Sequence, residues 1–179
     1  AKRVIDCGVI PGFISGLNSA SQDLIEQSLW GLGNIAGDSA AFRDLVISEG
    51  AIEAMVNTLE NAPGLSMKRN GAWALSNCCR GKPAPPFASI SKVVPLFCNF
   101  LKNENDVEVL TDAAWGLSYQ TGQNEGIEVV LSHDITSTLV RCLSGLEHSL
   151  LIPCLRVIGN IISGTDAQTS VILKEKDLF

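Results

Sequence analysis

The chain has 179 residues, 46% of them hydrophobic, a composition typical of a soluble folded protein that can bury a sizeable core. No apolar run approaches the roughly 20 residues that span a bilayer, and the first residues, AKRVIDCG, are too short and polar for a secretory signal. We therefore expect an intracellular protein with no membrane partner. The net charge of −6 is the opposite of what nucleic-acid binding needs and suits a basic partner, although a solvated surface is the commoner reason for an acidic balance.

Taken in chain order, the sequence predicts an all-α protein with short turns and no strand ladder. Residues 1–8 read as the end of a helix that Gly8 stops. Further helices are expected at 10–17, around Trp30 with an end at Gly37 and Asp38, at 40–48, at 52–60, around Trp73, at 91–102, around Trp115, at 122–131, at 135–143 and at 149–163. The prolines of KPAPP, residues 82–86, favour a surface connector, and residues 166–179 begin a further unit.

A short motif recurs at a nearly fixed interval. Trp30 begins WGLGNIAGD, Trp73 begins WALSN, Trp115 begins WGLSY and Arg156 begins RVIGN, about 42 residues apart. The period predicts a solenoid of about four three-helix repeats, at approximately 1–38, 39–82, 83–121 and 122–164, with the start of a further repeat at 165–179. Because repeat arrays usually have polar end units, we expect a fragment of a longer array, whose apolar cut ends would favour self-association.

Each of these helices is predicted to have an inward stripe and an outer line. At about 100° per residue, Leu29, Leu32 and Ala36 fall with Ile25 on one side, whereas Trp30, Asn34 and Asp38 fall on the far side. The inward sets expected for the later copies are Ala72, Leu75 and Cys79, then Leu110, Ala114 and Leu117, then Leu151, Leu155, Ile158 and Ile162, with Arg156 and Asn160 on the outer line. A large aromatic residue kept off the core is a sign of a binding surface.

The outer line has the chemistry to hold an extended basic peptide. Each Trp is a surface neighbour of the residue four positions later, and an Asn there can bond both the C=O and the N–H of a peptide main chain. Trp faces hold aliphatic stems and attract the cations at their tips, and Asp38 and Asp112 could pair with those cations. The alternative at a single copy is a packed Trp beside a capping or solvated Asn, and isolated Asp residues are more often surface charges. Repetition in one register favours a Lys/Arg-rich ligand.

Enzyme, metal and cofactor signals are absent from the sequence. The two histidines, His133 and His148, stand apart from any Cys pair, so a zinc site is not expected. The GLGNIAG run lacks the G-x-G-x-x-G spacing and lies within a helix, and no nucleophile elbow accompanies His133. The six cysteines, at positions 7, 78, 79, 98, 142 and 154, are expected to be reduced core residues, with a disulfide or metal role as the alternative.

Three stretches resemble one family. The runs EQSLWGLGNIAGDS (26–39), WALSNCCRGK (73–82) and RVIGNIISGTDAQT (156–169) are similar to the armadillo repeats of importin alpha, also called karyopherin alpha, and the similarity covers essentially the whole chain. The resemblance implies a right-handed superhelical solenoid of armadillo repeats whose third helices line a concave groove. It also implies that the groove binds nuclear localisation signals of cargo proteins, that importin beta is a partner, and that the protein occurs in cytoplasm and nucleus.

The resemblance further assigns roles to matching residues. The peptide-binding residues expected in this way and from the outer line are Trp30, Asn34, Asp38, Asn70, Trp73, Asn77, Asp112, Trp115, Tyr119, Arg156, Asn160, Ser163 and Asp166. Those from 30 to 77 resemble the major signal-binding site, with Asp38 at the acceptor of its principal lysine, and those from 156 to 166 resemble the start of the minor site. Tyr119 in place of an Asn and Arg156 in place of a Trp are exchanges that mark, in the family, the stretch between the two sites. The basic importin-beta-binding segment and the repeats that complete both sites are expected to be missing from this sequence.

A general armadillo scaffold that binds another protein partner through hydrophobic or acidic contacts is the alternative. Grooves of such scaffolds are typically basic and lack a regular Trp/Asn ladder. The acidic balance and the repeated Trp of this chain therefore favour nuclear import.

Overall fold

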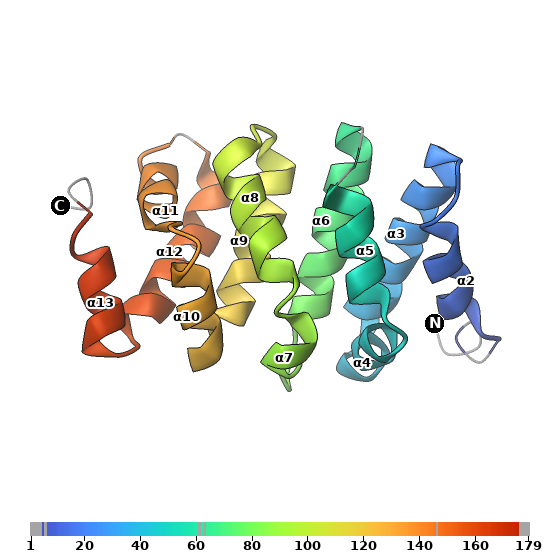
Figure 1. Ribbon diagram of the computed structural model, residues 1–179, viewed down its shortest axis with the longest axis horizontal. Coiled ribbons are helices and arrows are strands. Elements are labelled where there is room, and N and C mark those ends of the chain that lie inside the picture. The colour runs from blue at the N-terminus through green and yellow to red at the C-terminus, as the bar shows by residue number, and fades with distance from the viewer. Residues whose placement is uncertain (1–4, 6, 61, 63, 146, 176–179) are drawn as a thin grey trace. The chain divides into compact units, whose positions relative to one another are not determined.

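The computed structural model describes residues 5, 7–60, 62, 64–145 and 147–175, and within these residues it contains helices and no strand. The helices are α2 (Val9–Gly16), α3 (Gln22–Asp38), α4 (Ala40–Ser48), α5 (Ala51–Glu60), α6 (Leu65–Cys79), α7 (Phe87–Ile90), α8 (Val93–Asn103), α9 (Val107–Gln120), α10 (Asn124–Leu131), α11 (Thr136–Leu143), α12 (His148–Ile162) and α13 (Asp166–Ile172) (Figure 1). The chain divides into two compact units, residues 1–93 (unit 1) and residues 94–179 (unit 2).

The positions of the helices agree closely with the sequence-based expectation. The helices expected at 10–17, 40–48, 52–60, 135–143 and 149–163 are confirmed to within one residue at either end. The helix expected at 91–102 is α8, whose ends lie within two residues of the expected ones, and the short helix α7 that precedes it was not expected. The helix end expected at residues 1–8 lies mostly outside the described residues. Gly8 is described, and its φ of +74° belongs to the left-handed region that glycine adopts without strain.

Local signals start and stop the helices of unit 1. The Ser21 hydroxyl accepts a hydrogen bond from the Leu24 N–H and begins α3. Ser39 ends α3 and also begins α4, where its hydroxyl accepts a hydrogen bond from the Phe42 N–H. Ser39 is therefore the single residue between the two helices. Gly50, with φ +82°, makes the break between α4 and α5.

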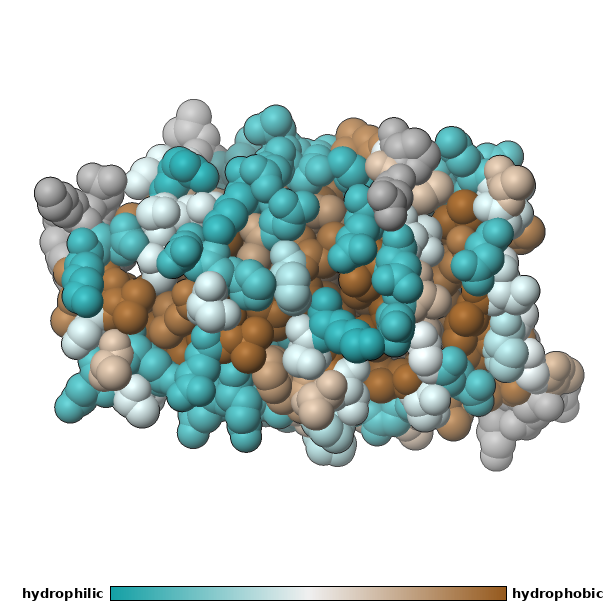
Figure 2. Space-filling view, viewed as in Figure 1, coloured by the Kyte–Doolittle hydropathy of each residue, from teal (hydrophilic) through white to brown (hydrophobic). Residues whose placement is uncertain are grey.

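The core of unit 1 lies between α3 and α6, with α2 and α5 packed against them. Leu29, Leu32 and Ala36 are buried, as are Ala72, Leu75 and Cys79, which confirms the inward stripes expected for both helices. On the face shown in Figure 2, hydrophobic side chains show along α2, next to a hydrophilic band over α5.

A buried arginine holds the connector that follows α6. The Arg43 side chain is 1% exposed, and its Nη1 donates to the carbonyls of Arg80 at 2.7 Å and Pro83 at 2.9 Å. Its Nε and Nη2 donate to one carboxylate oxygen of Asp44. Because a buried charge needs partners, these bonds fix α4 to the KPAPP segment, which is not helical.

Unit 2 has a matching core in which α9 packs against α12, with α11 and α13 also against α12. The Asp106 carboxylate begins α9 by accepting from the Val109 N–H, and Thr165 and Gln168 form a capping box at the start of α13. The stripe expected for α9 holds for Ala114 and Leu117, which are buried, while Leu110 is half-buried.

The inward set expected for α12 is wrong in part. Leu155 is 55% exposed and Ile162 is 48% exposed, while Leu151 is half-buried and Ile158 is buried as expected. The buried residues of α12 are Leu150, Pro153, Cys154, Val157, Ile158 and Ile161. Because α12 has apolar residues on nearly every side, its periodicity does not select one stripe, and packing against α9 and α11 selects it instead.

Candidate functional site

The outer line of α3 is open to solvent. Trp30 is 54% exposed, and Asn34 and Asp38 are also exposed, whereas the inward residues of the same helix are buried. The Asn34 Nδ2 donates to the Trp30 main-chain carbonyl at 2.8 Å, which holds the carboxamide against the preceding turn of α3. The expected placement of these three side chains away from the core is therefore confirmed, while their binding role stays a prediction.

Trp73 of α6 packs against α3 at Gly33. A Cβ built on Gly33 would lie 2.4 Å from Cζ3 and 2.8 Å from Cε3 of Trp73, so the indole occupies the space that any other residue at position 33 would need. Trp73 is half-buried as a result, and Asn70, one turn before it, is half-buried as well. The absence of a side chain at Gly33 thus sets where the second indole lies.

Asn77 does not lie on an open outer line, which corrects the expectation for this residue. It is 5% exposed, and its Nδ2 donates to the Gly33 carbonyl at 3.2 Å. A Cβ on Gly37 would lie 3.1 Å from the same nitrogen, so the two glycines let α3 approach closely enough to cover the carboxamide. Asn77 therefore ties the two helices together.

Asn160 makes the same kind of link in unit 2. Its Nδ2 donates to the Ser118 carbonyl at 3.0 Å and to the Thr121 Oγ1 at 3.1 Å, which joins α12 to the end of α9. Ser118 follows Trp115 by three residues, as Gly33 follows Trp30. The Asn of the motif thus has a structural role in both units that the sequence pattern did not distinguish from a binding role.

The aromatic position of unit 2 already holds a cation. The Arg156 Cζ lies 5.2 Å from the centroid of the Trp115 ring, and Trp115 stacks on Tyr119 with ring centroids 5.9 Å apart and an angle of 23° between planes. Arg156 is exposed, so its charge remains hydrated while the guanidinium lies over the indole. The structure brings these three predicted residues together as one stack.

The last two predicted residues lie near the end of α12. Ser163 is exposed and its hydroxyl donates to the Gly159 carbonyl, within the last turn of its own helix. Asp166 is exposed in the first turn of α13, where a carboxylate suits the helix N-terminus.

An acidic pocket lies beside the start of α9. Its volume is about 260 Å³, and it is lined by Val107, Glu108, Thr111, Asp112 and Ser149. Burial, together with the nearby charge of Glu108, raises the pKa of the Asp112 carboxyl to about 6. The sequence-based reasoning named Asp112 but missed Glu108, which the spacing of one helical turn could have indicated.

A cation is also present near Asp38. The Arg80 Nη2 donates to the Gly37 carbonyl at 3.3 Å, one residue before Asp38 in the chain. Sequence reasoning did not connect these residues, because Arg80 follows α6 and Asp38 ends α3.

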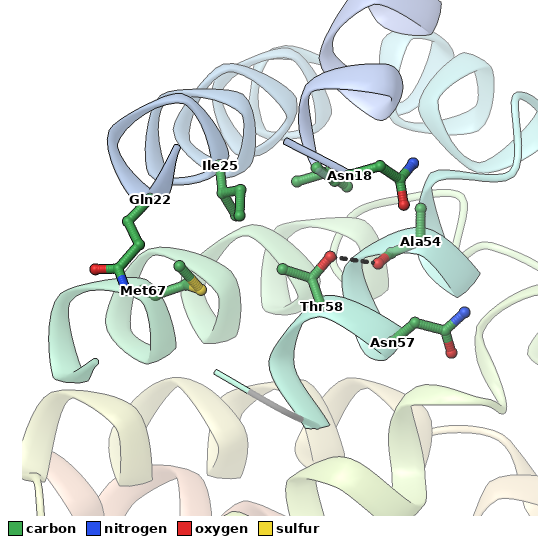
Figure 3. A pocket seen from close by; sticks show the side chains of 8 residues that line it. Asn18, Gln22, Ile25, Ala54, Asn57, Thr58 and Met67 are labelled. Atoms are coloured by element: carbon green, nitrogen blue, oxygen red, sulfur yellow. Dashed lines mark hydrogen bonds between the residues drawn. The ribbon is translucent and has the colours of Figure 1, made fainter. Parts of the chain in front are cut away.

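A further pocket of unit 1 contains none of the predicted residues. It has a volume of about 320 Å³, and Figure 3 shows the carboxamides of Asn18, Gln22 and Asn57 around it, with Ile25 and Met67 contributing apolar surface. The Thr58 hydroxyl at its edge donates to the Ala54 carbonyl. This pocket is distinct from the outer line of α3.

The described residues offer neither a metal site nor a membrane span. Among the described residues, no group of three or more His, Cys, Asp or Glu side chains could hold a metal ion. In the same part of the chain, no helix is both long enough and apolar enough to cross a membrane.

Comparison with known proteins gives consistent matches. The model of the armadillo/beta-catenin-like repeat matches residues 1–37 and 86–119. The chain is 45% identical to importin subunit alpha-1a and 41% identical to importin subunit alpha-1b of Oryza sativa subsp. japonica, in each case over 99% of its length. It is 43% identical to importin subunit alpha-3 of Arabidopsis thaliana over 98% of its length. These relatives are importin subunits and not enzymes, in agreement with the sequence-based expectation.

The chain spans about a third of the length of these curated relatives. Among solved structures, a designed armadillo repeat protein in complex with the peptide (KR)4 superposes with a TM-score of 0.83 at 23% identity, over 94% of this chain and 71% of that one. Another designed armadillo repeat protein superposes with a TM-score of 0.87 at 19% identity, over 98% of this chain and 74% of that one. The fold is therefore an all-helical armadillo-repeat solenoid.

Proposed function

We propose, from the premise that this chain belongs to the importin alpha family of armadillo-repeat proteins, that it is part of a nuclear import adaptor. In this proposal it binds extended Lys/Arg-rich nuclear localisation signals of cargo proteins. The observation that carries the proposal is the exposed line of Trp30, Asn34 and Asp38 on α3, on the side away from the buried residues Leu29, Leu32 and Ala36.

Each residue of this line has a distinct task in the proposed complex. The Trp30 face would take the aliphatic stem of a ligand Lys or Arg, with an attraction of about 0.5–2 kcal/mol for the cation. Asn34 already donates one N–H to the Trp30 carbonyl, which leaves its second N–H and its oxygen to bond the ligand main chain. Asp38 would accept the charged tip of the ligand side chain.

Unit 2 would bind a cation in a different way. In the pocket that Glu108 and Asp112 line, burial and the nearby Glu108 charge make ionisation of Asp112 costly, and an ammonium or guanidinium group placed there would offset that cost. Arg156 meanwhile covers the Trp115 face, so we assign no ligand cation to that ring. In unit 2, the proposed recognition therefore rests on charge more than on aromatic contact.

The proposed partners follow from the family. They are cargo proteins with basic signals and, for the whole adaptor, importin beta, with exchange between cytoplasm and nucleus. The designed protein solved with (KR)4 has the same fold, so the fold is compatible with the proposed class of ligand.

Titration of a fluorescent Lys-rich signal peptide tests the proposal. Trp30→Ala should weaken binding by about 2- to 30-fold, as expected for loss of one cation–π contact. Asp38→Asn should weaken it by a similar factor, while the matched control Glu60→Gln, which removes an exposed carboxylate from α5, should not change it. Equal affinity of wild type, Trp30→Ala and Asp38→Asn for the peptide would overturn the assignment of this surface.

A further inference from the structure

Helix α12 exposes a side that the matching helix α3 buries. The repeated motif begins at Trp30 in α3 and at Arg156 in α12, which aligns the two helices residue by residue. The matched pairs on this side are Leu29 with Leu155, Gly33 with Gly159 and Ala36 with Ile162. The α3 members are buried, whereas the side chains of Leu155 and Ile162 are exposed. An apolar surface that is covered in unit 1 is therefore open in unit 2.

Helix α6 is the element that covers this side of α3. The Trp73 ring fills the space beside Gly33, and the Asn77 Nδ2 donates to the Gly33 carbonyl at 3.2 Å. The space beside Gly159 is empty by comparison, because a Cβ built there meets no heavy atom within 4 Å among the described residues. The places that a Trp and an Asn take in the α3–α6 interface are thus vacant beside α12.

The Trp and the Asn that match this vacancy lie on α3. Trp30 and Asn34 hold the same motif positions as Trp73 and Asn77, and both are exposed. The Asn34 Nδ2 donates to a carbonyl of its own helix, whereas the Asn77 Nδ2 donates to a carbonyl of the neighbouring helix. One helix of the chain therefore presents the pair of side chains that the exposed side of another helix is shaped to receive.

We propose that α12 is an interaction surface for a second copy of this chain, which docks through its α3. Trp30 of the second copy packs on Gly159 of the first, and Asn34 of the second copy donates to the Gly159 carbonyl. That carbonyl already accepts from the Ser163 hydroxyl, and its second lone pair is available for this bond. The proposed contact repeats the α3–α6 interface between two molecules and does not depend on the proposed function.

Ser163 is a position at which the proposed contact differs from the α3–α6 interface. It matches Gly37, where a Cβ would lie 3.1 Å from the Asn77 Nδ2. The Cβ of Ser163 therefore presses on the carboxamide of Asn34 of the second copy, which must shift by a few tenths of an ångström. Because association also costs translational and rotational freedom, we expect copies that exchange and do not form a permanent complex.

The assembly has two properties that follow from this geometry. The contact joins unlike surfaces, so each copy keeps one surface for a further copy and growth does not stop at two unless a ring closes. Each copy has a net charge of −6, so salt should strengthen association by screening the repulsion between copies. Binding of a basic peptide should respond to salt in the opposite direction.

Sedimentation equilibrium of the full chain, without any peptide, tests the proposal. We expect the average mass to rise with concentration from the 19.0 kDa of one copy to values above those of two copies. Gly159→Leu fills the vacant space without touching the rest of the fold, so it should keep the wild-type unfolding midpoint or raise it, and should weaken association at least about 10-fold. The matched control is Gly12→Leu in α2, where a Cβ also meets nothing within 4 Å, and it should associate like wild type.

Two variants of α3 identify the surface of the second copy. Trp30→Ala should weaken association at least as much as Gly159→Leu, and Asn34→Ala should weaken it by about 2- to 12-fold, as expected for one hydrogen bond. A mass of one copy at every concentration, or Gly159→Leu associating like wild type, would overturn the proposal. Association that Gly159→Leu abolishes and Trp30→Ala leaves intact would exclude α3 as the occupant and would overturn it as well.

The outcome is separable from that of the peptide titration. Peptide binding is measured at dilutions where the chain is a single copy, and there Gly159→Leu should bind the basic peptide like wild type. Loss of the peptide effect of Trp30→Ala with association retained would overturn the proposed function alone. Peptide binding that is retained in a chain that never associates would overturn the proposed contact alone.

Discussion

Gly33 shows how a single residue positions the aromatic side chain of the next repeat. Trp73 lies where a Cβ at position 33 would be, and the Ala74 Cβ lies 3.0 Å from the same point. Gly33→Ala must therefore move the indole or the helix. Such overpacking typically costs about 1–3 kcal/mol, and the displaced ring should show an altered fluorescence spectrum.

Urea unfolding followed by fluorescence checks this expectation. Gly12→Ala in α2 is the matched control, because a Cβ there meets no heavy atom within 4 Å. The control should be neutral or slightly stabilising, since alanine has the higher helix propensity. Equal stabilities of Gly33→Ala and Gly12→Ala would show that the indole does not depend on position 33.

At the same scale, the Asp112 carboxyl predicts how the unfolding free energy depends on pH. Its folded pKa of about 6 lies above the value of 3.8 for an unperturbed carboxyl, so ionisation destabilises the folded state. This cost is fully present above the folded pKa and disappears as pH falls below the unfolded pKa. At pH 7 Asp112→Asn should raise the unfolding free energy by about 1–2 kcal/mol, after discount for the partly exposed site, and at pH 4 by nearly nothing.

Chemical unfolding of both proteins from pH 4 to pH 8 measures the difference. Under the proposed function, the same substitution should weaken binding of the basic peptide, because it removes the carboxyl that is proposed to pair with a ligand cation. A stability difference that does not change with pH would contradict the assigned shift.

At the scale of the helices, Asn77 and Asn34 hold the same position in the repeated motif but contribute differently to stability. Asn77 links α6 to α3 through its bond to the Gly33 carbonyl, whereas Asn34 bonds within its own helix and is exposed. Asn77→Ala should therefore destabilise unit 1 by about 1–2 kcal/mol, and Asn34→Ala by less than about 0.5 kcal/mol. Thermal unfolding of the two variants against wild type provides the measurement, and the reverse order would show that the link contributes nothing.

Helix positions could be predicted from the sequence because their signals are local. Ser21, Ser39 and Gly50 act within one turn of the chain, and the helices begin and end beside them. The inward stripe of α3 was predictable because polar Asn34 and Asp38 leave one apolar side. In α12, apolar residues surround the helix, so the exposed Leu155 could be placed only once α9 and α11 were known.

The candidate site was predictable where it depends on one helix and not where it depends on two. The exposure of Trp30 follows from the helical periodicity of the α3 sequence alone. The burial of Asn77 requires the close approach of α3 and α6 at Gly33 and Gly37, which no single-helix pattern contains. The stack of Arg156 on Trp115 likewise joins residues of two helices.

At the scale of the whole molecule, the net charge of −6 predicts how binding responds to salt. Exposed carboxylates attract a basic peptide over about 10 Å at 0.1 M salt and over about 3 Å at 1 M. Peptide affinity should therefore fall several-fold as NaCl rises from about 0.05 to 0.5 M. Fluorescence anisotropy measures this, with a peptide in which Gln replaces each Lys as the control that should show no such slope.

If the proposed function holds, the guanidinium of Arg156 above Trp115 has a consequence for the sequence of the bound signal. A Lys or Arg of a bound segment that reached this ring would meet a like charge over an aromatic face that is already covered. A glutamate or aspartate at the same register would meet a complementary charge instead. In the proposed complex, a basic peptide aligned along unit 2 should therefore tolerate an acidic residue opposite Arg156, because the contact of Arg156 with Trp115 removes the need for a positive charge at that position.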